Sequence, residues 1–162
     1  MLRYSYYQTY TQEIPDEFSL GFSVLGCDIH CPDCHSSHTW DINSEGQGTP
    51  LTTDVLDTAL ASQHWVTCVL FFGGEWDLEY LEFLCKYLMK HYQKKLALYS
   101  GRNLNFFLNS TLLDCLTYLK IGHYDKKLGG LIYPSTNQRL YRLSNGIAVE
   151  DLTSKFWKTR IT

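Results

Sequence analysis

Three cysteines lie within eight residues of the sequence, at Cys27, Cys31 and Cys34. Thiolates spaced by four and three residues can wrap one compact metal cluster. A cubane held by three thiolates keeps one iron open for an outside ligand, whereas electron-transfer ferredoxins close the cluster with a fourth cysteine. No further cysteine lies near these three in the sequence. The pattern therefore predicts a 4Fe–4S cluster with one open iron.

Zinc is the simplest alternative metal for this loop. His30, His35 and His38 lie nearby, and three cysteines with one histidine form a known structural zinc site. Zinc modules usually place two ligand pairs apart in the sequence, whereas all the sulfur here comes from one loop. The spacing favours iron–sulfur, and zinc stays open as the second interpretation.

The other three cysteines, Cys68, Cys85 and Cys115, are scattered along the chain. Cys85 falls on the apolar face of a predicted helix, where cysteine acts as a small core residue. A second cluster would need several cysteines close together, and these lie far apart in sequence. We interpret all three as core residues.

A second group that could bind a ligand is Gly73-Gly74-Glu75, which follows a short apolar segment. Two glycines let a ligand approach the backbone closely, and a glutamate beside them can pair with an ammonium group. On its own such a turn is common. If it lies beside the three-cysteine loop, it predicts a ligand-binding site.

The elements that must position these residues alternate between strand and helix patterns. Helices are predicted over 53–62 and 77–92, with a weaker one over 105–113, and residues 43–50 read as a surface loop. The predicted strands span residues 19–25, 66–72, 96–99, 116–121 and 139–143.

Alternating strands and helices predict βαβ units, a parallel sheet and right-handed crossovers. In such sheets the loops after the carboxyl ends of the strands meet at one edge. We therefore expect an α/β fold, an open partial (β/α) barrel with a mostly parallel sheet, formed by residues 1–162 as a single domain. The cysteine loop, the Gly-Gly-Glu turn, Ser100-Gly101 and Gly122 should then share that edge.

The bulk composition narrows the function classes. The formal net charge is −3 in 162 residues, with no basic stripe, so no nucleic-acid partner is expected. No apolar run is long enough to span a bilayer, and the N-terminal residues lack a signal-peptide core. We expect a cytoplasmic protein with no membrane partner.

The cysteine spacing and the Gly-Gly-Glu turn together resemble a known family, the radical S-adenosylmethionine enzymes. Within it the chain is most similar to activating proteins of the anaerobic (class III) ribonucleoside-triphosphate reductase. Many radical enzymes carry an aromatic residue just before the third cysteine, whereas Asp33 stands there; the reductase activators are often non-aromatic at that place. The stretches that carry the resemblance are Cys34-His35-Ser36 with Trp40, Phe71-Phe72-Gly73-Gly74-Glu75-Trp76, Leu98-Tyr99-Ser100-Gly101, Leu119-Lys120-Ile121-Gly122, Leu128-Gly129-Gly130-Leu131 and Thr136-Asn137-Gln138-Arg139.

The resemblance implies a role for each matching residue. Cys27, Cys31 and Cys34 would ligate three irons, and the remaining iron would bind the amino and carboxylate groups of S-adenosylmethionine. The methionine end would be held by Gly73, Gly74 and Glu75. Asp33 and His35 would lie against the nucleoside, and Ser100 would reach the ribose.

The resemblance also implies a reaction. Reductive cleavage of S-adenosylmethionine would give methionine and a 5′-deoxyadenosyl radical, which takes a hydrogen from a glycine of the reductase. The partners would be the glycyl-radical subunit of anaerobic ribonucleotide reductase and an electron donor such as flavodoxin or ferredoxin. Two alternatives stay open: another short radical enzyme, similar to a deazaguanine synthase, acting on a small molecule, and a non-enzymatic Fe–S or zinc module. The role of Asn137-Gln138-Arg139 is left open.

Overall fold

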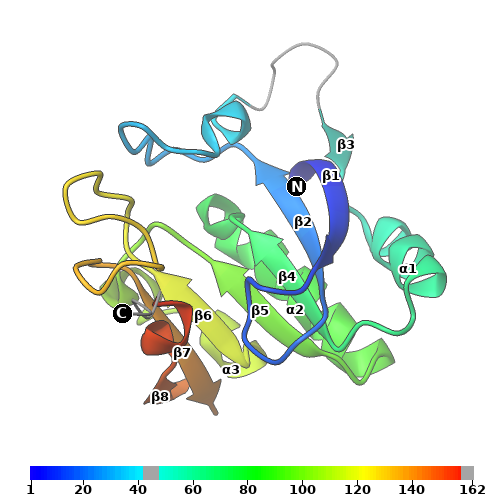
Figure 1. Cartoon of the computed structure of the whole chain (residues 1–162). Coiled ribbons are helices and arrows are strands. Elements are labelled where there is room, and N and C mark those ends of the chain that lie inside the picture. Colours follow the sequence, from blue (N-terminus) through cyan, green and yellow to red (C-terminus); the bar gives the residue numbers. More distant parts are fainter. Residues whose placement is uncertain (42–47, 158–162) are drawn as a thin grey trace.

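The computed structural model describes residues 1–41 and 48–157. Their strands form one eight-stranded sheet in the order β3-β1-β2-β4-β5-β6-β7-β8 (Figure 1). The predicted loop over 43–50 lies mostly outside the described residues. The strands are β1 (Arg3–Tyr10), β2 (Ser19–Leu25), β3 (Thr49–Pro50), β4 (Cys68–Phe72), β5 (Lys95–Tyr99), β6 (Tyr118–Ile121), β7 (Arg139–Ser144) and β8 (Ile147–Asp151).

The expected fold class is wrong. Among the described residues four strand pairings are antiparallel and three are parallel, so the sheet is mixed and mostly antiparallel. A parallel neighbour needs a long crossover connection, usually a helix, whereas antiparallel neighbours do not. The described residues 122–138 contain no helix, and β7 returns antiparallel to β6. At the other side β1, which was not predicted, pairs antiparallel with β2 and β3.

Within this mixed sheet, β2, β4, β5 and β6 are neighbours and run parallel to one another. The loops that follow these four strands therefore lie at one edge of the sheet, as predicted (Figure 1). That edge carries the cysteine loop and the Gly-Gly-Glu turn.

Helices α1 (Thr53–Ser62) and α2 (Leu78–His91) lie close to their predicted bounds. The side chain of Thr52 accepts a hydrogen bond of 3.3 Å from the backbone N–H of Val55 and caps α1. The weaker helix predicted over 105–113 is wrong. A 3₁₀ turn (Leu104–Phe107) and the four-residue α3 (Leu112–Cys115) take its place.

The apolar side chains form two core clusters. The larger joins the strands to Leu56 of α1, Leu81 of α2 and Leu112 of α3. The smaller includes Ile14, which precedes β2, and Leu152, which follows β8. Helices therefore contribute to the larger cluster only, and irregular segments complete the smaller one. The described helices include none long and apolar enough to cross a membrane.

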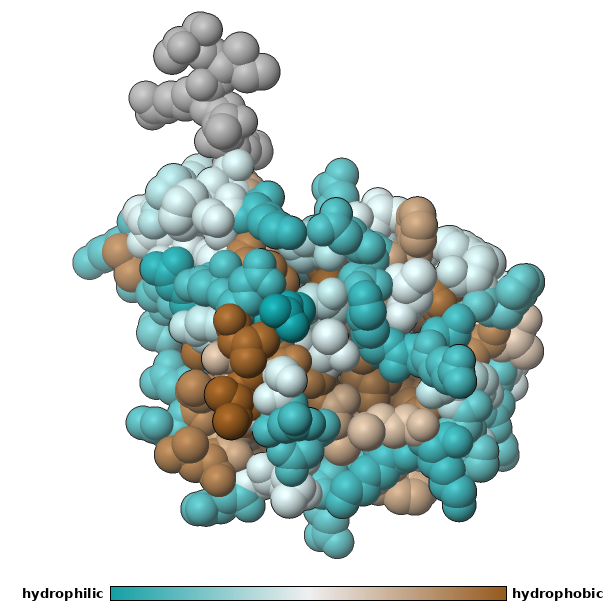
Figure 2. All heavy atoms as spheres, turned by 90° about the horizontal axis from the view of Figure 1, so that it is seen from below, coloured by the Kyte–Doolittle hydropathy of each residue, from teal (hydrophilic) through white to brown (hydrophobic). Residues whose placement is uncertain are grey.

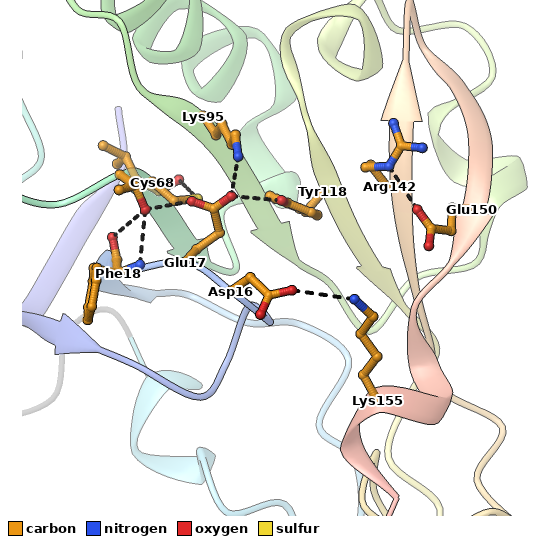
Figure 3. A network of polar contacts seen from close by, with 11 residues as sticks. Asp16, Glu17, Phe18, Cys68, Lys95, Tyr118, Arg142, Glu150 and Lys155 are labelled. Carbon is orange, nitrogen blue, oxygen red and sulfur yellow. Dashed lines mark hydrogen bonds and ion pairs between the residues drawn. The ribbon is translucent and has the colours of Figure 1, made fainter.

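A buried carboxylate ties the segment before β2 to the far end of the strands, away from the cysteine loop. Glu17 is 5% exposed and accepts hydrogen bonds from Thr67 at 2.5 Å, from Tyr118 at 2.8 Å and from Lys95 (Figure 3). Burial by itself would raise the pKa of Glu17, but these hydrogen bonds outweigh it, and the pKa is lowered. This network is structural.

Large apolar side chains are also exposed on several elements, including Phe83 on α2, Leu108, and Ile147 and Val149 on β8. Seen from below, apolar side chains gather in a patch bordered by hydrophilic residues (Figure 2). Apolar atoms contribute much of the accessible surface of folded proteins, so exposed apolar side chains are normal.

Candidate functional site

A cavity of about 720 Å³ lies at the sheet edge where the four parallel strands end. Cys27, Cys31 and Cys34 all line it, and all three thiols are free and partly exposed. The same cavity is lined by Glu75 from the loop after β4 and by Ser100 from the loop after β5. The two features singled out in the sequence therefore share one site.

Hydrogen bonds hold the backbone at the start of the cysteine loop and join the loop to the segment after β5. Gly26 takes a φ of 103°, and the carbonyl of Thr39 accepts hydrogen bonds from the N–H groups of Gly26 at 2.7 Å and Cys27 at 3.1 Å. Further along, Asp28 accepts a hydrogen bond of 2.5 Å from Arg102, which follows β5. These contacts seat the loop over the carboxyl ends of the strands.

The three thiols can be considered as cluster ligands. Among the described residues, no three His, Cys, Asp or Glu side chains are grouped so as to hold one metal ion. In a cubane each thiolate binds a different iron, so the sulfurs line a shared space without converging on one point. Backbone N–H groups assist: the N–H of Ser36 donates to Sγ of Cys34 at 3.3 Å. Burial raises the pKa of the Cys27 thiol, while hydrogen bonds from the backbone of Ile29 and His30 act in the opposite direction.

The floor of the cavity is a row of side chains at one level of the sheet. Ser23, Phe72, Tyr99 and Lys120 are successive register partners across β2, β4, β5 and β6, and all four line the cavity. The rings of Phe72 and Tyr99 meet edge to face, with centroids 5.3 Å apart. The row offers an apolar, aromatic surface that ends in one cation.

Glu75 is the acidic group of the site. It is 2% exposed, and its Oε1 accepts a hydrogen bond of 2.8 Å from the Ser100 hydroxyl. Within the described part of the chain, its Oε2 is buried and has no hydrogen-bond partner. Burial raises the pKa of this carboxyl. A buried carboxylate oxygen of this kind is suited to a cationic ligand.

Lys120 is the basic group of the site. It is 9% exposed, and its ammonium donates to the carbonyls of Gly122 at 3.1 Å and Ser100 at 3.5 Å. No carboxylate among the described residues forms an ion pair with it. Burial lowers the pKa of Lys120 to about 8, although Cys31, Glu75, Cys34 and Cys27 act to raise it. A buried cation that lines a cavity is suited to an anionic ligand group.

A family model described as a 4Fe-4S single cluster domain matches residues 19–141. The chain belongs to this family. The match covers β2 through the first half of β7, and with them the whole cysteine loop, Glu75 and Lys120. Membership supports a 4Fe–4S cluster as the cofactor and fits an iron–sulfur family of the radical S-adenosylmethionine type. Searches of curated proteins and of solved structures found no match.

In this 4Fe-4S single cluster domain some of the other predicted site residues line the cavity and some do not. His35, Gly73 and Ser100 line the cavity. Gly74 does not line it: a Cβ atom there would lie 3.1 Å from Leu2, so the residue faces the core. Asp33 does not line it either, and its exposed carboxylate lies 3.4 Å from the ammonium of Lys126.

The motif Asn137-Gln138-Arg139, whose role the sequence left open, closes the long loop after β6. The side-chain amide of Asn137 donates to the carbonyl of His123 at 3.1 Å, and that of Gln138 donates to the carbonyl of Gly122 at 3.3 Å. Gln138 also lines the cavity. The motif therefore fastens the end of this loop to its start, beside the site.

Sequence reasoning missed the floor row of the 4Fe-4S domain. Lys120 and Tyr99 stand in stretches that carry the resemblance to the reductase activators, but neither was assigned a role in the site. A signal was present, because each strand carries its floor residue at or near its carboxyl end. Strand ends alone do not fix register, so the row became visible only with the pairing of the sheet.

Proposed function

We propose that this 4Fe-4S domain is a radical S-adenosylmethionine activase that generates a glycyl radical on an anaerobic ribonucleotide reductase. The observation that carries the proposal is the pairing of charges around the cavity. A buried carboxylate at Glu75 and a buried ammonium at Lys120 line the same cavity as the three cysteine thiols. The amino acid end of S-adenosylmethionine carries the two complementary charges.

Each residue then has a defined task. Oε2 of Glu75 accepts a hydrogen bond from the methionine amino group, and Ser100 keeps the other carboxylate oxygen in place. Lys120 pairs with the methionine carboxylate. Cys27, Cys31 and Cys34 hold the cluster, which when bound and reduced supplies the electron that breaks the sulfonium carbon–sulfur bond.

The floor of the cavity protects this chemistry. Phe72 and Tyr99 present aromatic surface to the cavity, and Tyr99 is the register partner of Lys120. Apolar walls exclude water and strengthen the charge pairing that orients the ligand. Exclusion of water also protects a reactive carbon radical from side reactions.

The rim of the cavity is suited to a polypeptide. Ile132 and Tyr133, from the loop after β6, line the cavity and are also 37% and 52% exposed. Exposed apolar and aromatic side chains beside a site are typical of a protein-binding surface. The reductase as partner follows from the sequence resemblance.

The test is anaerobic. The protein is reconstituted with iron and sulfide, reduced with dithionite, and studied by electron paramagnetic resonance with and without S-adenosylmethionine. We expect a reduced-cluster signal that changes on adding S-adenosylmethionine, formation of 5′-deoxyadenosine, and a glycyl radical when the reductase is added. Cluster binding without any 5′-deoxyadenosine would contradict the enzymatic proposal, and 5′-deoxyadenosine without a glycyl radical would contradict the partner.

A further inference from the structure

Trp76 carries a buried polar atom that the chain itself does not satisfy. It follows Glu75 directly and lines the cavity. Within the described residues its indole Nε1 is buried and has no hydrogen-bond partner. Leaving a buried N–H without an acceptor is costly, so such a group asks for an explanation. The cavity is where an acceptor can be supplied.

The indole is held between two glycines. A Cβ atom at Gly26 would lie 3.0 Å from Nε1 of Trp76, and one at Gly73 would lie 2.5 Å from Cη2 at the other end of the ring. Both glycines take positive φ values, 103° and 89°. Backbone therefore contacts the ring at both ends, and the pyrrole edge lies against the residue that immediately precedes Cys27.

No described protein group accepts a hydrogen bond from this N–H. The carbonyl of Thr39 accepts hydrogen bonds from both Gly26 and Cys27. Cys27 and Trp76 line the same cavity, so the acceptor that fits the free N–H is one that enters with the cofactor. The sulfurs of a 4Fe–4S cluster bound at Cys27 are such acceptors.

We propose that the indole N–H of Trp76 donates a hydrogen bond to a sulfur of the cluster at its Cys27 side and raises the reduction potential of the cluster. When the cluster takes up one electron from an external reductant, its sulfurs gain negative charge and no bond breaks. A fixed N–H donor stabilises that added charge, and hydrogen bonds to sulfur are among the factors that set cluster potentials. The inference requires the cluster of this family, and it does not depend on the activase reaction.

The first test detects the contact directly. Protein labelled with ¹⁵N at the tryptophan indole is reconstituted and reduced, and pulsed electron paramagnetic resonance is used to measure the nitrogen coupling to the cluster. We expect a coupling that disappears in Trp76→Phe and persists in Trp157→Phe. Trp157 is a matched control, because its Nε1 is also buried without a partner in the described chain but does not line the cavity. A wild-type reduced cluster without indole coupling would overturn the inference.

The second test measures the potential. Redox titrations of the reconstituted protein compare wild type, Trp76→Phe, Trp157→Phe and a variant with benzothienylalanine at position 76, which keeps the ring size and lacks the N–H. We expect a lower midpoint potential in both position-76 variants and no shift in Trp157→Phe. Benzothienylalanine guards against loss of packing in Trp76→Phe. An unchanged potential in that variant, or an effect confined to affinity for S-adenosylmethionine, would show that the N–H does not act on the cluster.

Discussion

The hydroxyl of Ser100 donates a hydrogen bond of 2.8 Å to Oε1 of Glu75, and both residues are 2% exposed. The contact joins the loop after β4 to the loop after β5, two segments that are separate in sequence. The Ser100 oxygen also accepts a hydrogen bond from the backbone N–H of Arg102 at 3.0 Å. Glu75 is therefore held at one oxygen, and its second oxygen remains available for a ligand.

Replacing Glu75 by glutamine should weaken S-adenosylmethionine binding and leave the cluster in place. Glutamine keeps the size and the hydrogen-bonding contact with Ser100 but removes the negative charge. A hydrogen bond to a charged group contributes roughly 1.5–3 kcal/mol, so the dissociation constant should rise about 10- to 100-fold. Calorimetric titration of the reconstituted protein measures this. Glu79→Gln, an exposed change on α2, is the control, and equal affinities in the two variants would refute the assignment of Glu75.

Replacing Lys120 by methionine should weaken binding only of ligands that carry the methionine carboxylate. The loss should again be about 10- to 100-fold for S-adenosylmethionine, because a charge-assisted contact is removed. Decarboxylated S-adenosylmethionine should bind wild type and Lys120→Met alike. Lys90→Met, an exposed change, controls for net charge.

Lys120→Met should also keep the thermal stability of the protein. Lys120 is buried without an acidic partner among the described residues. Removing the cost of burying this charge should offset the loss of its two hydrogen bonds to backbone carbonyls when methionine takes its place. We expect the thermal unfolding midpoint of Lys120→Met without ligand to equal or exceed that of wild type. A large fall would show that Lys120 serves the fold rather than a ligand.

The cysteines should divide into two groups by iron content. Cys31→Ala should lose the cluster and its visible absorption, since an open-iron cubane has no spare thiolate. Cys85→Ala should keep full iron, because Cys85 is fully buried in the larger core cluster and burial raises the pKa of its thiol. Iron and sulfide analysis after reconstitution checks both. Loss of iron in Cys85→Ala would point to a second metal site.

The Glu17 network should make stability depend on pH. The folded pKa of Glu17 is lowered from its ordinary value of 4.5, so its contribution is fully present above that value and is lost as the pH falls through the folded pKa. At pH 7, Glu17→Gln should reduce the free energy of unfolding by roughly 1–3 kcal/mol, because it breaks a buried, charge-assisted network.

Urea unfolding at pH 7 and pH 3 tests this expectation with the protein in the same metal-free form. The difference between wild type and Glu17→Gln should shrink at pH 3. Glu150→Gln removes a surface ion pair with Arg142 (Figure 3) and should change stability by less than about 1 kcal/mol. A difference for Glu17→Gln that is independent of pH would mean that its charge does not contribute.

The sequence by itself determined the cluster loop and the middle of the fold. Cys27, Cys31 and Cys34 were recognisable because metal ligation imposes residue type and short spacing, both of which are local. Strand β2 and helices α1 and α2 were predicted near their bounds, because apolar periodicity and an N-cap at Thr52 are local signals too. The meeting of Glu75 with the cysteines followed from the rule for parallel strands.

Only the tertiary structure decided the edges of the sheet and the second half of the site. Strand β1 has a polar, tyrosine-rich sequence and pairs through its backbone, and the sense of β7 depends on how residues 122–138 return. The Ser23–Phe72–Tyr99–Lys120 row exists through strand register, and the free N–H of Trp76 exists through its packing between Gly26 and Gly73. Register and packing are long-range properties, so the strand ends that the sequence indicates did not fix them.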